Sequence, residues 1–310
     1  MNRYSVAADD RKTSAPRLDI DRGQLALAFD REPLGFSHSL SELGLFKLES
    51  LHVLAQKMSD HPRDYFIAES APSPGAEFYS VPNAPYKPPE AIEKLGAGAL
   101  RILLKRPEDH DRDFKELIAT LFAQVVDCVP RLANERIVRL ESGILISSAA
   151  TITPFHMDPE CGFFSQIEGE KMYHVYSPAV ITERELEQSA TAGCVKLTPV
   201  ELTGRDPARE YVFKLVPGKG FHQPHNAPHW VETGRDRSIS YTFVFETEAS
   251  RARARTRAFN HYMRRLQVNP AVPGCSQTGD AVKSHAMQAI RAVTPLRRLA
   301  GRVIKNVVKS

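Results

Sequence analysis

The sequence predicts a mainly β fold with flanking helices, and the hydrophobic pattern supports this in three regions. Residues 136–246 contain short runs rich in β-branched and aromatic residues, separated by Gly, Pro and Asp. Such a series of short strands is typical of a β-sandwich or barrel. Helical patterns of apolar residues precede this region, and two more follow it. The β-rich runs are RIVRLESGILISS, TITPFHM, GFFSQIEG, KMYHVYSP, REYVFKLVPG, HWVETG and SISYTFVFE.

The region before the β core is predicted to be mixed α/β and to pack on the core. Residues 1–20 predict a disordered arm, and residues 21–135 form the mixed region. Apolar residues at helical spacing predict a helix from roughly Leu43 to Met58. A second amphipathic helix is expected over DRDFKELIATLFAQVVDCV, where the side chain of Asp111 or Asp113 opens the first turn. DYFIAE and ALRILLKRP are strand candidates.

Composition and cysteine spacing exclude several classes of protein. The chain has 310 residues, of which 42% are hydrophobic and 25% are charged, as in ordinary globular proteins. It contains no run of about eighteen apolar residues, so we expect no transmembrane helix. The N-terminal stretch lacks the apolar segment of a secretory signal. Cys128, Cys161, Cys194 and Cys275 are scattered without a CxxC pair, which favours a cytoplasmic protein over a disulfide-bonded one.

Charge divides the chain into an acidic body and a basic helical tail, which we place at residues 247–310. Residues 251–310 hold thirteen Lys or Arg and one acid, a net charge of +12, which leaves −8 on residues 1–250 of the total of +4. The tail has two candidate functions. An apolar stripe along its last helix would serve a homodimer, although Pro295 would kink or break that helix. The arginines would alternatively contact the phosphates of a nucleic acid. Without a base-reading motif, dimerisation is the preferred hypothesis, and nucleic-acid binding is the less favoured alternative.

The stretch TITPFHMDPECGFFSQIEGEK raises the possibility of a metal site. His156 and Asp158 are two residues apart, so on a strand their side chains project to the same face. A later segment, FHQPHNAPHWV, offers His222, His225 and His229 as a third ligand. Two histidines and one carboxylate form the facial triad of non-haem Fe(II) oxygenases. An HxD pair also arises by chance on ordinary surface turns, so the spacing by itself leaves both interpretations open.

These segments resemble those of the JmjC and cupin-like 2-oxoglutarate oxygenases. The chain is especially similar to the asparaginyl hydroxylase that inhibits the hypoxia-inducible factor. In that family a Thr-Pro-x-His-x-Asp segment is followed by an aromatic-rich strand and a lysine fifteen residues after the histidine. Here Thr153 lies three residues before His156 and Lys171 lies fifteen after it. The resemblance covers roughly residues 136–246 and implies a double-stranded β-helix, the cupin or jelly-roll fold, as the catalytic core.

The resemblance implies that Fe(II) is bound by His156, Asp158 and His229. His229 is preferred because it follows Pro224 by five residues and enters a strand, as the distal ligand does in the family. His225 remains the competitor for that position. His222 is expected to have a structural or supporting role.

The resemblance also implies a 2-oxoglutarate site within the barrel. Lys171 and Thr153 would hold the distal carboxylate of the co-substrate. Gln166 is expected to share the cavity face with Phe164, and Tyr173 is a weaker candidate. The chain departs from the family at two positions. It has Thr242 where the last core strand often carries Asn, and we expect Thr242 to contact the co-substrate. It also has Lys219 where the family has Asp after Pro-Gly.

The function expected from this resemblance is that of an Fe(II)- and 2-oxoglutarate-dependent dioxygenase. It would be a hydroxylase, or a demethylase if the oxidised carbon is an N-methyl group. A non-catalytic cupin that binds a metal or small ligand is the alternative, and a metal-dependent isomerase-type cupin is a third. The substrate is open among proteins, peptides and small molecules. The proline-rich stretch from Ser70 to Pro89 predicts a loop that covers the site or contacts substrate. Cys161 is expected to be a packing residue.

Overall fold

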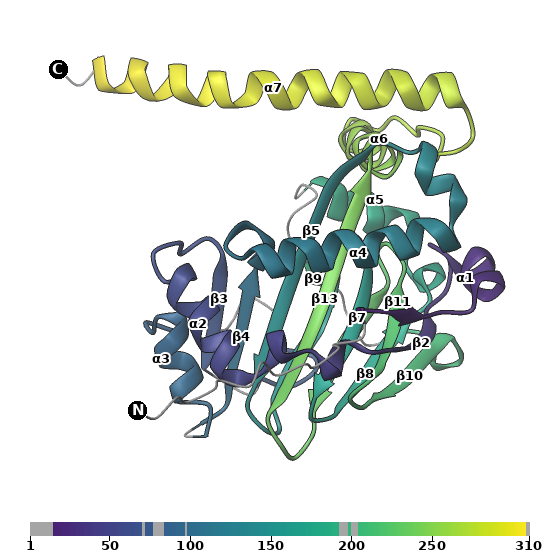
Figure 1. Cartoon of the computed structure of the whole chain (residues 1–310). Coiled ribbons are helices and arrows are strands. Elements are labelled where there is room, and N and C mark those ends of the chain that lie inside the picture. The colour runs from purple at the N-terminus through teal and green to yellow at the C-terminus, as the bar shows by residue number, and fades with distance from the viewer. Residues whose placement is uncertain are drawn as a thin grey trace, which may run out of the picture.

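Two antiparallel β-sheets form the centre of the protein (Figure 1). The computed structural model describes residues 15–69, 72–76, 84–96, 98–191, 198–199 and 204–307. The larger sheet is eight-stranded within these residues, in the order β1 (Leu18–Asp19), β2 (Leu34–His38), β11 (Lys219–Gln223), β7 (Cys161–Glu168), β13 (Ser238–Thr247), β5 (Ile137–Ser147), β4 (Leu100–Lys105) and β3 (Tyr65–Glu69). The smaller sheet, again within the described residues, is five-stranded, in the order β10 (Glu210–Leu215), β8 (Lys171–Tyr176), β12 (Pro228–Thr233), β6 (Ile152–Met157) and β9 (Thr198–Pro199).

The order of the core strands is that of a double-stranded β-helix. From β5 to β8, and again from β10 to β13, each strand lies in the opposite sheet from the strand before it. The two sheets therefore bring residues from distant parts of the chain face to face. The predicted fold class, a mainly β jelly-roll core with flanking helices, is confirmed.

The N-terminal region does more than pack on the core, because it supplies strands to the larger sheet. β1 and β2 extend the sheet beyond β11, and β4 and β3 extend it beyond β5. β2 and the short helix α1 (Arg22–Ala28) were not predicted. Residues 1–14 of the predicted disordered arm lie outside the described residues. Leu18 at its other end is buried in β1, so the arm does not extend to residue 20.

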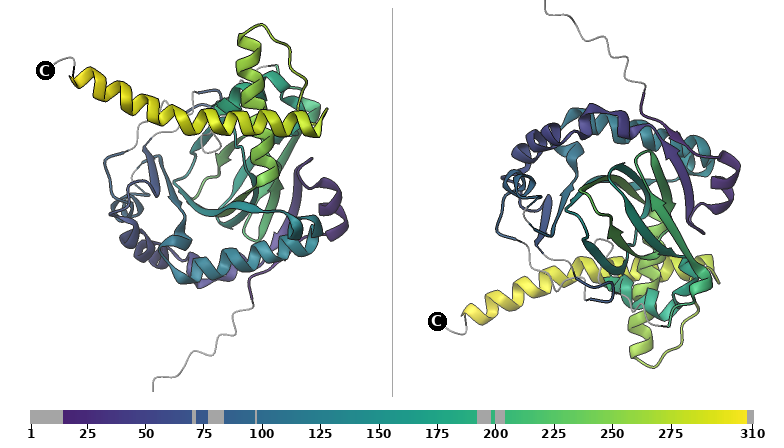
Figure 2. Two further views of the ribbon diagram at one scale, coloured as in Figure 1. Left: turned by 90° about the horizontal axis from the view of Figure 1, so that it is seen from above. Right: turned by 90° about the horizontal axis from the view of Figure 1, so that it is seen from below.

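Helices cover the outer face of the larger sheet, as the views along the barrel show (Figure 2). The predicted helix over 43–58 is shorter, because a 3-10 turn at Gly44–Phe46 precedes α2 (Leu48–Met58). A third helix, α3 (Pro88–Glu93), begins within the stretch that was predicted to be loop.

The longest helix on this face is α4 (Arg112–Cys128), and its buried side chains recur at helical spacing. Asp111 caps its first turn by accepting a hydrogen bond from the backbone N–H of Asp113 at 3.0 Å. The side chain of Phe114 packs against Tyr241 of β13, with ring centroids 6.4 Å apart. The buried side chains of α4 are Phe114, Leu117, Ile118, Leu121 and Val125.

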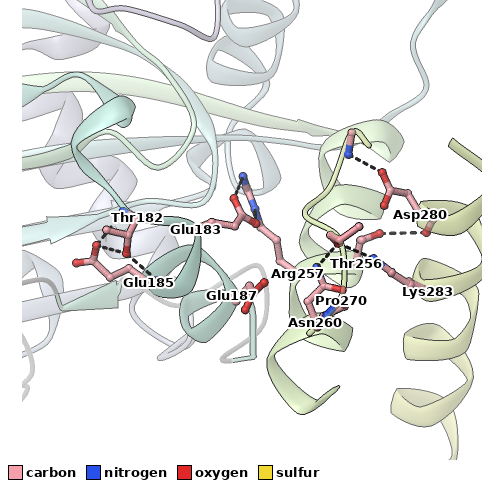
Figure 3. A network of polar contacts seen from close by, with 12 residues as sticks. Thr182, Glu183, Glu185, Glu187, Thr256, Arg257, Asn260, Pro270, Asp280 and Lys283 are labelled. Carbon is pink, nitrogen blue, oxygen red and sulfur yellow. Dashed lines mark hydrogen bonds and ion pairs between the residues drawn. The ribbon is translucent and has the colours of Figure 1, made fainter. Parts of the chain in front are cut away.

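Part of the basic tail is attached to the acidic body by ion pairs. α5 (Glu183–Thr191) was not predicted, since it interrupts the β-rich region, and it packs beside α6 (Glu248–Arg265). Figure 3 shows Arg257 of α6 reaching Glu183 of α5. The pairs between α6 and the body are Arg251–Glu246, Arg257–Glu183 and Arg264–Glu187.

The last helix, α7 (Gln277–Val307), crosses α6 and then projects beyond the body (Figure 1). The helix extends on both sides of Pro295, which itself donates no backbone hydrogen bond, so the chain does not break there. Val282 and Ile290 of α7 are exposed, at 64% and 50%. The homodimer and the cytoplasmic location stay predictions. No helix in the described part of the chain combines the length and apolar character needed to cross a bilayer.

Candidate metal centre

The register between β6 and β12 brings the predicted ligands together. His156 lies on β6 and Asp158 follows its last residue, while His229 lies on the neighbouring strand β12. The two strands pair antiparallel with His229 directly opposite His156. Across the turn that precedes β12, the backbone N–H of Asn226 donates to the carbonyl of Asp158 at 2.8 Å. This bond ties the Asp158 loop to the segment that carries His229.

The three side chains surround one small volume between the sheets. The rings of His156 and His229 are 4.1 Å apart between centroids. Asp158 Oδ1 is 3.8 Å from His156 Nε2, and Asp158 Oδ2 is 3.7 Å from His229 Nε2. One ligand atom from each residue lies within 4.8 Å of the others. That spread suits a divalent ion, whose bonds to nitrogen and oxygen are about 2.0–2.2 Å long.

Hydrogen bonds fix which imidazole nitrogen faces this volume. His156 Nδ1 lies 2.7 Å from the carbonyl oxygen of Pro154, and His229 Nδ1 lies 3.0 Å from that of Ala227. A carbonyl only accepts, so each Nδ1 carries the proton and each Nε2 presents a lone pair. Burial lowers the pKa of His156 to about 3, helped by the neighbouring His229, and burial also lowers the pKa of His229. Both rings are therefore neutral at pH 7, the form that binds metals.

The carboxylate of Asp158 fits a bound cation. Its Oδ1 atom is buried and accepts no hydrogen bond from the described residues. A buried carboxylate oxygen without a donor is unfavourable unless a positive charge compensates it. The donor set of two neutral imidazoles and one carboxylate matches the facial triad of non-haem iron sites.

The structure separates His229 from the other two candidates. His225 Nδ1 forms an ion pair with Asp30 Oδ1 at 2.5 Å, outside the cluster of ligand atoms. His222 is fully buried; its Nδ1 faces the carbonyl of Gly162, and its Nε2 accepts from the backbone N–H of Asp30 at 3.1 Å. Neither ring reaches the volume between His156 and Asp158.

A cavity of about 180 Å³ lies between the two sheets and contains this cluster. Lys171, Thr153, Thr242 and Tyr173 all line it, as the sequence analysis expected. Its walls are largely apolar, which limits the water that can surround a bound ligand. The apolar lining residues are Leu103, Leu145, Phe163, Phe164, Val231 and Val244.

Lys171 is a buried cation that faces the same cavity. Gly169, at φ +68°, makes the tight turn after β7 so that Lys171 begins β8. The side chain is 3% exposed, and its Nζ lies 5.6 Å from the centre of the Phe164 ring. Burial lowers the pKa of Lys171 to about 7, and the charge of Arg101 contributes. No carboxylate among the described residues forms an ion pair with this ammonium, and none contributes to its pKa shift. Its surroundings therefore favour an anionic ligand.

The expectation that Gln166 lines the cavity is wrong. Its amide nitrogen donates to the carbonyl of Glu168 at 2.7 Å and to Ser238 Oγ at 2.8 Å. Its amide oxygen accepts from Ser240 Oγ at 2.9 Å. These bonds hold the side chain at the β7–β8 turn and against β13, and the cavity is lined without it.

The sequence analysis missed Gln223, which lies beside the metal cluster at the end of β11. Tyr173 donates from its hydroxyl to Gln223 Oε1 at 3.0 Å, and this bond orients the amide. Gln223 Nε2 then lies 3.5 Å from Asp158 Oδ2. An amide that is held in this way positions the carboxylate. The only available signal was a polar residue next to the histidines of FHQPH, which does not specify a partner.

Two other predictions concern residues near the cavity. Cys161 is fully buried in the core between the larger sheet and its helices, which agrees with a packing role, and burial raises the pKa of its thiol. The predicted loop of residues 70–89 lies partly outside the described residues. In its described part, the carbonyl of Pro74 accepts from the backbone N–H of Phe155 at 2.8 Å. The loop therefore contacts the strand that carries His156.

Comparison with known proteins supports the fold. No family model matches the sequence, and the search of curated proteins found no match. Among solved structures, YcfD of E. coli matches over 90% of this chain and 69% of its own, with a TM-score of 0.50 and 15% identity. A second structure of YcfD, described as a ribosomal oxygenase from Escherichia coli in complex with cobalt and 2-oxoglutarate, matches over 90% and 68%, with a TM-score of 0.50 and 16% identity. At these identities the likeness shows the fold alone. The resemblance to the asparaginyl hydroxylase stays a prediction.

Proposed function

We propose that the protein is an Fe(II)- and 2-oxoglutarate-dependent oxygenase that hydroxylates a C–H bond of its substrate. The observation that carries this proposal is the shared cavity of the metal cluster and Lys171. Two imidazoles with fixed tautomers and one carboxylate face the same enclosed volume as a buried ammonium without a carboxylate partner. A 2-oxo acid with a second carboxylate can satisfy both the metal and the ammonium at once.

The roles of the residues follow from this arrangement. His156, Asp158 and His229 would hold Fe(II) from one side, which leaves positions for the co-substrate and oxygen. Lys171 would bind the distal carboxylate of 2-oxoglutarate with Thr153, so that the 2-oxo acid end points to the metal. The bound iron and co-substrate supply the oxidative chemistry, in which 2-oxoglutarate and O₂ give succinate, CO₂ and a hydroxylated substrate. The apolar walls limit competing access of water.

The similar fold of YcfD, solved with cobalt and 2-oxoglutarate, supports the choice of metal class and co-substrate. The substrate class is open. A hydroxylated N-methyl carbon would decompose to release formaldehyde, so demethylation is a possible outcome of the same reaction. The alternative of a non-catalytic cupin predicts metal binding without turnover.

The decisive test is an anaerobic titration of Fe(II)-loaded protein with 2-oxoglutarate, followed by the metal-to-ligand charge-transfer absorption. We expect the band in the wild type and in His225→Ala, and its loss in His229→Ala. The His225 variant is the matched control, since it removes an imidazole four residues away. A band that persists in His229→Ala and disappears in His225→Ala would move the ligand to His225. Binding without any conversion of 2-oxoglutarate to succinate, even with candidate substrates, would favour the non-catalytic cupin.

A further inference from the structure

A second cation, the half-buried Arg101, lies next to the proposed 2-oxoglutarate site. It is on β4, where Leu100, Ile102 and Leu104 are buried in the core beneath the helices. Side chains alternate along a strand, so Arg101 and Leu103 point to the opposite face. Leu103 lines the cavity. β4 therefore directs Arg101 toward the side of the sheet that contains the metal cluster.

The contacts of Arg101 leave part of its hydrogen-bonding capacity unused. Its Nη1 donates to Thr153 Oγ1 at 3.2 Å. Its Nε is buried and has no hydrogen-bond partner among the described residues. The guanidinium is close enough to Lys171 to help lower the pKa of that amine. Thr153, the acceptor of this bond, lines the cavity together with Lys171, and the contact therefore places Arg101 at the Thr153 wall of that cavity.

A buried lysine and a half-buried arginine beside one cavity repel each other and lose hydration, and both effects are unfavourable without an anion. The contact with Thr153 also has a chemical consequence. Because Thr153 Oγ1 accepts from Arg101, its own hydroxyl proton is available to another acceptor. Arg101, Lys171 and Thr153 together present donors of the kind that bind a carboxylate.

We propose that Arg101 is a second cationic ligand for the distal carboxylate of 2-oxoglutarate, acting with Lys171 and Thr153. This inference rests on the proposed function and extends it, since the family resemblance assigned only the lysine and the threonine. An arginine offers a planar fork of donors that matches both carboxylate oxygens, which a lysine cannot do alone. The pair of cations makes the site selective for 2-oxo acids whose far end carries a negative charge.

The test is calorimetric binding to the metal-loaded protein under anaerobic conditions. Two ligands are compared: 2-oxoglutarate, and 2-oxoglutaramate, which has the same length and 2-oxo acid end but a neutral amide at the far end. The variants are Arg101→Met, Arg101→Lys and Lys105→Met. Lys105 is the matched control, because it lies on the same face of β4 at the exposed end of the strand. Thermal unfolding of each variant checks that it is folded.

We expect Arg101→Met to weaken binding of 2-oxoglutarate by about 10- to 100-fold, the usual effect of losing one charged hydrogen-bonding partner. Binding of 2-oxoglutaramate should change by less than about threefold in the same variant. Arg101→Lys should fall between the wild type and Arg101→Met for 2-oxoglutarate, and Lys105→Met should match the wild type.

Three results would overturn the inference. Unchanged 2-oxoglutarate affinity in Arg101→Met, with normal wild-type binding, would refute the role of Arg101 and leave the proposed function intact. An equal loss of affinity for both ligands would show that Arg101 supports the cavity and does not recognise the charge. A wild type that binds metal without binding 2-oxoglutarate would refute the proposed function and the inference together.

Discussion

The described part of the chain contains two clusters of two histidines and one aspartate, and they differ in what the aspartate contacts. His156, Asp158 and His229 form one cluster, between the sheets. The other consists of His61, Asp64 and His110, which lie in the loops just before β3 and α4. In each cluster one ligand atom per residue lies within 4.8 Å of the others. Residue type and spacing therefore do not separate them.

The partners of the carboxylate do separate the two clusters. Asp64 already accepts a hydrogen bond from Arg106, and His110 Nε2 lies 2.8 Å from Asp64 Oδ2. Burial would raise the pKa of Asp64, but the hydrogen bonds from Arg106 and His110 outweigh it and lower the pKa. A guanidinium thus already compensates the charge of the carboxylate that a metal would need. Asp158 has no such partner, and its Oδ1 accepts no hydrogen bond from the described residues. The comparison indicates that the hydrogen bonds a carboxylate already accepts decide whether it can bind a metal ion.

The largest expected effect tests this contrast directly. Asp158→Ala should weaken Fe(II) binding by more than about 100-fold, because loss of a ligand exceeds the 10- to 100-fold effect of losing a supporting residue. Asp64→Ala should bind Fe(II) with the wild-type stoichiometry. Metal content after anaerobic loading and desalting measures both. Two ions per wild-type chain, falling to one in Asp64→Ala, would contradict the distinction between the clusters.

The second-largest effect concerns the protonation of Lys171, which supplies positive charge to the cavity in addition to the metal. The pKa of Lys171 is lowered to about 7, so the amine loses its proton as the pH rises through that value. A carboxylate prefers the charged amine, and we expect 2-oxoglutarate affinity to fall by up to about tenfold per pH unit above pH 7. Lys171→Arg should remove this slope, because arginine stays protonated. A slope that is the same in the variant would assign the titration to another group.

A smaller effect is expected when the residue that orients the carboxylate is changed. Gln223→Leu should weaken Fe(II) binding by about tenfold, since the Tyr173–Gln223 pair no longer positions Asp158. Gln223→Glu offers a comparison, because its carboxylate can also approach the ion. Competition with a chelator of known affinity gives the dissociation constants. Wild-type affinity in Gln223→Leu would show that the metal cluster is held by its own strands alone.

The smallest effect on metal binding should come from the second cluster, where stability changes instead. Asp64→Asn should lower the free energy of unfolding by about 1–2 kcal/mol at pH 7, with Fe(II) affinity unchanged. The lowered pKa of Asp64 means that this stabilisation is present above about pH 4 and is lost in acid. The difference between wild type and variant in urea unfolding should therefore shrink below about pH 4. A difference that is constant with pH would argue against a role of the ionised carboxylate.

Local sequence predicted much of the fold, because alternation and helical spacing are properties of short segments. The β-rich runs formed strands, and the 3.6-residue pattern of α4 formed a helix capped by Asp111. The pattern failed where an element depends on its neighbours. β2 is completed by pairing with β1 and β11, and α5 is joined to α6 through Glu183 and Glu187. Both elements are short, and α5 has few apolar residues, so neither stands out in the sequence.

The sequence by itself determined that His156 and Asp158 share one side of a strand, and that a lysine follows at a fixed distance along the next hairpin. Those relations are local, and strand geometry sets them. Only the tertiary structure decided that His229 completes the cluster while His225 turns to Asp30. It also decided that Gln223 lines the cavity and that Arg101 bonds to Thr153 of its wall. These side chains come from different strands. The pairing of those strands within two facing sheets brings them together, and no single segment of the sequence encodes that pairing.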